Sequence, residues 1–262
     1  MSSTRQDDVQ RPFRRYLSKT PEISVFFWII KILASAAGDP VADLLGTTAG
    51  LGLAITTMLL ATATTVVILI QFSAARYVAG LYWLTVVLIS VMGSLVVDNL
   101  TDILEVPLGV TVIAAAVLLA GTFVVWFAAE KTLSIHTIDT GRRETFYWVA
   151  VALTFVLGTA AERLAVPSVS AVAGLVALLV AGLASRVRGV PALIPFWLAY
   201  LVTQPLGVAV SNLLSEPRDA GGLQIGVAGI SAGILAAVVA LVRYVSATHR
   251  DDPSLDNTRR PW

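Results

Sequence analysis

The sequence contains one structural unit four times. In each unit a tryptophan is followed ten residues later by a glycine, in the pairs Trp28 with Gly38, Trp83 with Gly93, Trp148 with Gly158, and Trp197 with Gly207. An aromatic residue precedes each tryptophan, namely Phe27, Tyr82, Tyr147 and Phe196. Each unit lies within an apolar stretch long enough to cross a bilayer, which takes about 20 residues. We therefore expect a membrane protein built from four tandem repeats.

The composition agrees with lipid as the solvent. Apolar residues make up 56% of the 262 positions and charged residues 13%, whereas soluble domains carry about 25% charged residues. We expect an all-α polytopic protein whose eight transmembrane helices lie near residues 23–45, 50–72, 82–104, 107–129, 146–165, 167–185, 192–214 and 224–245. The repeats then cover residues 23–76, 77–131, 146–186 and 191–245, between an N-terminal segment (1–22) and a tail (249–262). The polar start and the long first span argue against a cleaved signal peptide.

The basic residues predict how the helices cross the membrane. Fifteen of the eighteen basic residues lie in the N-terminal segment, the tail and the connections between repeats, whereas only Arg163 and Arg218 lie at the opposite face. By the positive-inside rule, both termini are expected in the cytoplasm. Four helical hairpins of parallel orientation follow, related by an axis along the membrane normal.

The composition also limits the chemistry that we expect. The chain has no cysteine, and its two histidines, His136 and His249, lie in expected loops or tails, so thiolate and histidine-rich metal sites are excluded. No phosphate-binding loop, dinucleotide fingerprint or hydrolase motif is present. Because the basic residues follow the topology, nucleic-acid binding is not expected. We expect no cofactor and no enzymatic activity, and membrane lipid as a partner; the oligomeric state stays open.

Three stretches of the sequence resemble a known family. They are FFWIIKILASAAGDPVADLL, LYWLTVVLISVMGSLVVDNLTD and EKTLSIHTIDTGRRETFYW. They are similar to a family of bacterial integral membrane proteins built from a repeat of unknown function. The resemblance implies a bacterial inner-membrane location and the eight-helix layout, and it brings no established activity. It also implies an acidic residue five positions after each glycine, where this chain has Asp43, Asp98, Arg163 and Asn212.

A polar seam follows the odd-numbered helices. Counted from each tryptophan, positions +3, +7, +11 and +15 share one helix face, with a drift of about 40° per step. In the first two repeats the polar residues there are Lys31, Ser35, Asp39, Asp43, Ser90, Ser94 and Asp98, with Asp102 one turn further. In the last two they are Thr159, Arg163, Gln204 and Asn212, with Glu162 beside Arg163. The even-numbered helices are rich in small residues instead, which is typical of close helix packing.

Charged side chains at membrane depth persist when they are paired, hydrated or functional. Asp39 lies about 16 Å beyond Trp28 by helical rise, near the midplane, and Pro40 disturbs the turn before it. A carboxylate beside free carbonyl groups suits a hard cation. The alternatives are solvation at the helix ends for Asp43, Asp98 and Asp102, an ion pair for Arg163, and an ammonium that extends to the interface for Lys31. The tryptophans are interpreted as interface anchors or as packing residues between repeats.

Two functions fit these patterns. The first is a transporter or channel, in which the four polar seams meet and pass a small solute, a hard cation or a proton. The second is a scaffold, sensor or assembly partner without transport, suggested by the polar N-terminal segment and the loop at 131–144. A membrane enzyme ranks third, because only Asp98, Asp102 and Glu105 approach an acid–base cluster.

Overall fold

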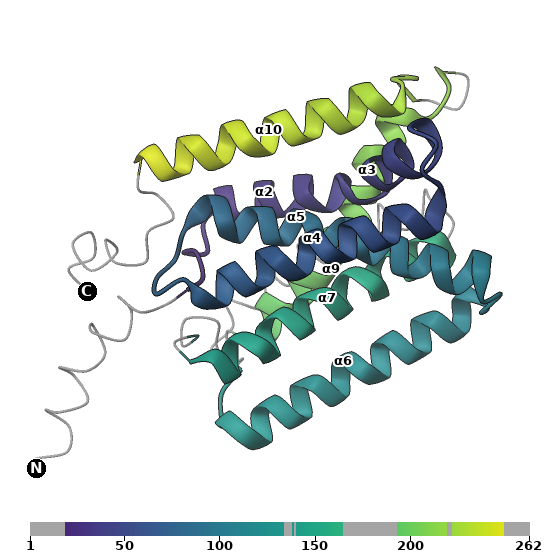
Figure 1. Cartoon of the computed structure of the whole chain (residues 1–262). Helices are drawn as coiled ribbons and strands as arrows, with labels where there is room; N and C mark the ends of the chain where they lie inside the picture. Colours follow the sequence, from purple (N-terminus) through teal and green to yellow (C-terminus); the bar gives the residue numbers. More distant parts are fainter. Residues whose placement is uncertain (1–18, 134–137, 139, 165–192, 219–221, 249–262) are drawn as a thin grey trace, which may run out of the picture.

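Long apolar helices make up most of the part of the chain that the structure describes. The computed structural model describes residues 19–133, 138, 140–164, 193–218 and 222–248 (Figure 1). Seven helical segments within these residues are long and apolar enough to cross a membrane. The segments are all-α, as expected. The expected helix at 167–185 lies outside the described residues.

The helix bounds agree with the sequence expectations to within a few residues. The elements are α2 (Val25–Ala36), α3 (Gly38–Asp43), the π-helix η1 (Leu44–Thr48), α4 (Gly52–Ser73), α5 (Ala79–Asp98), the π-helix η2 (Asn99–Ile103), α6 (Leu108–Glu130), α7 (Gly141–Leu164), α9 (Leu193–Ser215) and α10 (Val227–Thr248). The first span is divided at Ala37, three residues before Pro40. Pro205, in contrast, lies inside an uninterrupted α9.

Local side-chain chemistry explains where several helices begin. The hydroxyl of Ser24 accepts a hydrogen bond from the backbone N–H of Phe27 at 3.3 Å, which caps the start of α2. Thr140 accepts in the same way from the backbone N–H of Arg143 at 3.4 Å. For this reason α7 begins five residues before the expected start at residue 146. Gly50 and Gly52 both have a φ of +73°, a backbone conformation that glycine adopts without strain, at the turn into α4.

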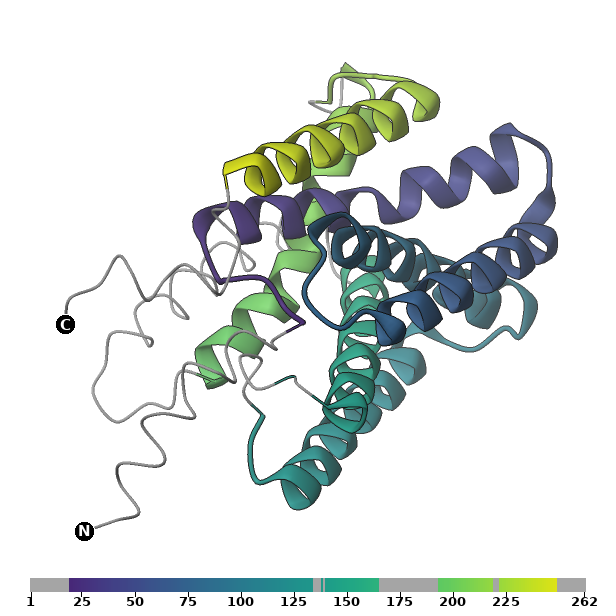
Figure 2. The ribbon, with the colours of Figure 1, turned by 60° about the vertical axis from the view of Figure 1, so that its left-hand side comes forward.

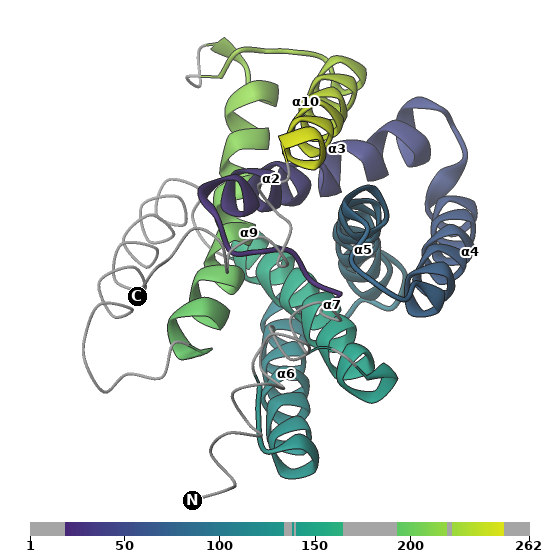
Figure 3. The same ribbon diagram turned by 90° about the vertical axis from the view of Figure 1, so that its left-hand side faces the viewer.

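The helices form an inner ring and an outer layer. The spans that carry the [FY]-W pairs are α2–α3, α5, α7 and α9, and they surround a common axis (Figure 3). The outer helices α4, α6 and α10 lie outside them. Burial follows this division: 67% of the most apolar window of the α5 span is buried, against 11% for α4. The polar seams therefore belong to the inner helices, and the outer helices present apolar side chains to their surroundings.

Each described outer helix packs mainly on the inner helix of a neighbouring repeat, although α10 also contacts α9 of its own repeat, and the expected arrangement in four parallel hairpins stays a prediction. α4 packs on α5 of the next repeat instead of on α2, α6 packs on α7, and α10 packs on α2 (Figures 2 and 3). The π-helices η1 and η2 and the connections after them lie between the two helices of the first and second repeats. These segments separate the paired helices, so each outer helix covers its neighbour's inner helix.

Inner and outer helices run in opposite directions. Every inner helix starts at the end of the bundle that holds the [FY]-W pairs, which we call the aromatic end, and finishes at the opposite end, which we call the charged end (Figure 1). The start of α2 and the end of α10 both lie at the aromatic end. Leu164 ends α7 at the charged end, whereas α9 starts again at the aromatic end.

The small residues of the outer helices divide into two groups. Several of them are buried, namely Thr56, Thr64, Thr111, Ala115 and Ser231. A Cβ built on Gly109, Gly121 or Gly233 would instead meet no described atom within 4 Å. The repeat glycines of the inner helices are all in tight contact, so the glycine crossings between helices occur within the ring.

Candidate functional site: the axis of the inner ring

Aromatic side chains join each repeat to the next at the aromatic end. The residue before each tryptophan packs on the tryptophan of the following repeat. The ring centroids lie 5.5 Å apart for Phe27 with Trp83, 5.5 Å for Tyr82 with Trp148, 6.1 Å for Tyr147 with Trp197, and 5.8 Å for Phe196 with Trp28. The last of these contacts joins the fourth repeat to the first. The four tryptophans are therefore packing residues between repeats, one of the two roles expected for them.

The four repeat glycines form a second layer with the same cyclic order. A Cβ on each glycine would lie within 3.0 Å of the +7 residue of the following repeat. These contacts join Gly38 to Ser90, Gly93 to Phe155, Gly158 to Gln204, and Gly207 to Ser35. Because no side chain fits at the crossings, the inner helices approach one another as closely as their backbones allow. The close contact between neighbouring inner helices thus explains why a glycine stands ten residues after each tryptophan.

Arg163 connects two other repeats at the charged end. Its Nη2 donates to Oδ1 of Asp39 at 3.0 Å, and its Nη1 donates to Oδ1 of Asp98. We call these three side chains the charged cluster. They are partly exposed, with Arg163 at 28%, Asp39 at 26% and Asp98 at 22% of their full side-chain exposure. Arg163 therefore makes the ion pair that was one of the alternatives, and it occupies carboxylate oxygens that a cation would need.

Polar contacts also join the third and fourth repeats. The amide of Asn212 donates to Oε1 of Glu162 at 3.3 Å, and the amide of Gln204 donates to the hydroxyl of Thr159 at 3.4 Å. Thr159, Gln204 and Glu162 are buried, and Asn212 is half-buried. All four repeats thus contribute polar groups to the same interior.

Lys31 is buried inside the ring, at 1% exposure. Its ammonium donates to the hydroxyl of Ser35 at 2.9 Å and lies 4.0 Å from the ring centre of Phe155 and 4.5 Å from that of Tyr200. No acidic side chain of the described residues forms an ion pair with it. The interpretation of Lys31 as a side chain that extends to the membrane interface is therefore wrong. Two aromatic faces and one hydroxyl stabilise the buried ammonium instead.

The serines of the seam lie between Lys31 and the charged cluster. Ser90 donates to the backbone carbonyl of Ser35 at 3.5 Å, which joins α5 to α2. Ser94 is buried, and its hydroxyl has no hydrogen-bond partner among the described residues. Its oxygen would lie 2.9 Å from a Cβ on Gly38. Hydroxyl groups therefore continue the polar interior through the glycine layer.

Two of the expected acids lie outside this arrangement. Asp43 is exposed at the end of α3, and Asp102 is exposed in η2, where it accepts a hydrogen bond from the hydroxyl of Thr101 at 2.9 Å. Neither makes an ion pair with another described residue. Both fit the alternative of solvation at a helix end, since Asp43 is the last residue of α3 and Asp102 lies in the π-helical turn after α5.

The sequence analysis missed two interactions at the aromatic end. The hydroxyls of Tyr82 and Tyr147 lie 2.5 Å apart and share a buried hydrogen bond. Lys19 forms an ion pair with the buried Glu144 at 2.7 Å and donates to the carbonyl of Phe72 at 2.9 Å. Two of the tryptophans are preceded by tyrosine instead of phenylalanine, and this difference in the sequence could have indicated the hydrogen bond between Tyr82 and Tyr147. Nothing in the spacing signalled the second.

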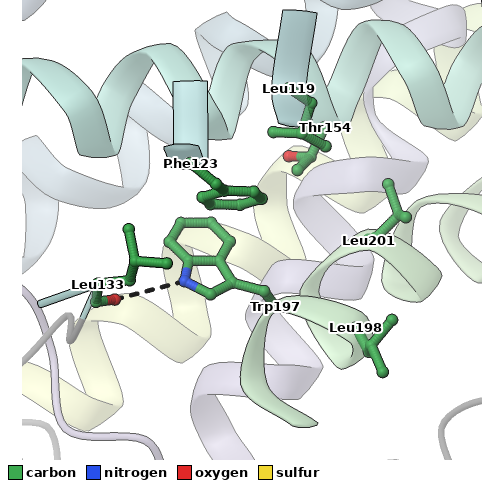
Figure 4. Close-up of a pocket in the computed structure, with 7 residues that line it drawn as sticks. All are labelled: Leu119, Phe123, Leu133, Thr154, Trp197, Leu198 and Leu201. Atoms are coloured by element: carbon green, nitrogen blue, oxygen red, sulfur yellow. Dashed lines mark hydrogen bonds between the residues drawn. The ribbon is translucent and has the colours of Figure 1, made fainter. Parts of the chain in front are cut away.

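Apolar grooves lie between the outer and inner helices at two places. One, of about 250 Å³, is bounded by Leu119 and Phe123 of α6 and by Trp197, Leu198 and Leu201 of α9. In Figure 4 the indole of Trp197 lies against Phe123, with its N–H directed at the carbonyl of Leu133, 3.5 Å away. The other groove, of about 290 Å³, lies between α5 and α10. It is lined by Trp83, Leu84 and Val87, which occupy the same positions in their repeat as Trp197, Leu198 and Leu201.

Comparison with known proteins agrees with the repeat. Residues 26–77 and 81–132 each match a family model described as Repeat of Unknown Function (DUF347). Each match corresponds to one inner and one outer span, from α2 to α4 and from α5 to α6. No curated protein and no solved structure matches the chain significantly. The chain therefore contains a tandem repeat, similar to this repeat of unknown function, within apolar helices that are long enough to cross a membrane.

Proposed function

We propose that this protein is a multi-pass membrane transporter or channel whose path follows the axis of the inner ring. The observation that carries the proposal is the buried polar interior, to which all four repeats contribute. A protein with no use for this interior would replace a buried ammonium and its hydroxyls with apolar side chains, which is often neutral or stabilising. Intramembrane ionisable groups are by default functional candidates.

The topology of the proposal includes the eighth span that the sequence predicts at 167–185, outside the described residues. With eight spans both termini are on one side, and the basic residues favour the cytoplasm for that side. A bacterial inner membrane is the location that the family resemblance implies.

The charges guide the choice of solute. Arg163 already pairs with two of the carboxylates proposed as cation ligands. The described residues contain no group of three or more His, Cys, Asp or Glu placed to hold a metal ion. Lys31 adds a positive charge on the axis, which repels cations and attracts anions. We therefore rank a small anion ahead of a hard cation as the species that moves, and a proton, which titratable side chains can carry without a ligand cage, stays in the proposal.

The glycine layer requires the path to open during transport. At the crossings of Gly158 and Gly207 a Cβ would lie only 2.4 Å from Gln204 and Ser35, so the helices leave no room for a solute there. Passage needs the inner helices to separate, as in gated or alternating-access transport. The charged cluster, which is partly exposed, would receive the solute on one side of this constriction.

Flux measurements test the proposal. Proteoliposomes containing the full chain would be assayed for movement of protons, chloride, nitrate, Na⁺ and Mn²⁺ with ion-sensitive dyes. We expect flux of one of these species, lost in Lys31→Met and reduced at least tenfold in Asp39→Asn and Asp98→Asn. Asp102→Asn, which removes an exposed acid, serves as the matched control and keeps wild-type flux. Wild-type flux in all three seam variants would refute the path.

The alternative is a scaffold or sensor that acts through the loop at 131–144. The described residues of this loop are used internally: Ile138 is buried and accepts a hydrogen bond from the N–H of Lys19 at 3.2 Å, and Glu144 pairs with Lys19. Arg142 and Arg143 both pair with Glu130. These contacts leave less of the loop for a partner. Absence of flux for every probe, with a protein captured through this loop, would favour the alternative.

A further inference from the structure

The groove between α5 and α10 differs from its counterpart between α6 and α9 in one charged residue. Both grooves are lined by a tryptophan and by the residues one and four positions after it. The α5–α10 groove also has Arg243 in its lining, whereas the described lining of the other has no charged residue. The two grooves therefore use the same repeat positions, and the α5–α10 groove adds a positive charge to them.

The α5–α10 groove is open to the surroundings of the bundle. Leu84 is 48% exposed and Val239 is 55% exposed, one on each side of it. Gly80 lines it near the start of α5, and a Cβ there would meet no described atom within 4 Å. In a membrane, an open apolar channel on the outer surface is filled by hydrocarbon. The groove therefore fits an acyl chain lying along the two helices.

Arg243 is positioned to bind a lipid headgroup. It lies in the last turns of α10 and is exposed, and it forms no ion pair with a described residue. This is the aromatic end of the bundle, where α10 ends, so Arg243 lies near the level at which this span would leave the bilayer. A second exposed arginine, Arg76, precedes Gly80 by four residues in the connection to α5. Guanidinium groups bind phosphate through two parallel hydrogen bonds.

We propose that the α5–α10 groove is a binding site for an anionic phospholipid. One acyl chain lies along Leu84, Val87 and Val239, and the headgroup phosphate pairs with Arg243. The site requires the spans to lie in a membrane, but it does not depend on transport. A basic residue beside the bound headgroup favours anionic over neutral lipid by about fivefold.

The test uses the purified full chain in detergent micelles. Binding of phosphatidylglycerol and of phosphatidylcholine with the same acyl chains would be measured by native mass spectrometry. Arg243→Gln is expected to weaken phosphatidylglycerol binding about fivefold and to leave phosphatidylcholine binding unchanged. Gly80→Leu places an apolar side chain in the groove, at a position where a Cβ meets nothing within 4 Å, and is expected to weaken both. Leu84→Trp fills the same groove from the exposed side and is expected to act like Gly80→Leu.

The matched control is Lys131→Gln. Lys131 is an exposed basic residue that follows α6 at the same end of the bundle, and it lies outside the groove. Its loss is expected to change neither lipid affinity by more than about twofold, because its charge contributes only through the surface field. Equal loss in Lys131→Gln and Arg243→Gln would show attraction by the whole basic surface. That result, or full phosphatidylglycerol binding in the groove-filling variants, would overturn the assigned site.

Discussion

Replacement of Gly207 by alanine tests the contact that closes the ring. A Cβ at this position would lie 2.4 Å from Cβ of Ser35 and 2.7 Å from the backbone nitrogen of Ala36. Carbon atoms at optimal separation lie about 3.5–4.0 Å apart, so α9 and α2 would have to move apart by about 1 Å. Overpacking of this kind costs about 1–3 kcal/mol.

The matched control is Gly121→Ala in the middle of α6, where a Cβ meets nothing within 4 Å. Alanine is favoured over glycine in a helix interior by about 0.5–1 kcal/mol, so this variant is expected to be slightly more stable. Gly207 also lies inside a helix, so this gain applies to both variants, and their free energies of unfolding should differ by the overpacking cost of about 1–3 kcal/mol. Gly38→Ala is expected to lie between them, because two of its close contacts are serine hydroxyls that can rotate.

Thermal unfolding of the purified variants in one detergent, followed by circular dichroism, measures this difference. The reasoning predicts a lower midpoint for Gly207→Ala than for the wild type, and a midpoint equal to or above the wild type for Gly121→Ala. Equal midpoints for the two alanine variants would refute it, since α9 and α2 would then not be in close contact in the folded protein.

Two further variants test buried charges. Lys31→Met is expected to unfold at or above the wild-type temperature, since removal of an ammonium that has no ion pair with a described residue relieves its desolvation; a loss of more than about 2 kcal/mol would contradict this. Glu144→Gln is expected to cost up to about 3 kcal/mol, because it breaks the pair with Lys19 at 2.7 Å. Arg142→Gln, which removes an exposed arginine beside Glu130, is the control for the second variant and should cost less than about 1 kcal/mol.

Much of the inner ring could be predicted from the sequence, because the repeat and the polar seam both depend on short-range periodicity. The tryptophan and glycine spacing identified the inner helices, and the four-residue spacing placed Asp39, Asp98 and Arg163 on faces that the structure brings together. Which residue pairs with which depends on the cyclic order of the repeats. The cyclic order depends on contacts between residues far apart in the sequence, so it cannot be predicted from a local sequence pattern.

The failures of the sequence analysis have physical causes. Lys31 was assigned to the interface because a lysine near a helix start commonly extends there, and the aromatic faces of Phe155 and Tyr200 come from other repeats. The pairing of α4 with α5 depends on the path of the chain after η1, which hydrophobic periodicity does not encode. The small residues of the outer helices suggested close packing, which fits the buried Thr56 and Ser231, whereas Gly121 and Gly233 have no close neighbour among the described residues.

The most direct test of the shared interior is a double-mutant cycle between Asp39 and Arg163. These residues belong to the first and third repeats, and they lie 3.0 Å apart only if the polar seams converge on one axis. Unfolding free energies of Asp39→Asn, Arg163→Gln and the double variant are predicted to give a coupling energy of about 1 kcal/mol or more. Additivity to within about 0.3 kcal/mol would contradict the account, because the two side chains would then act independently.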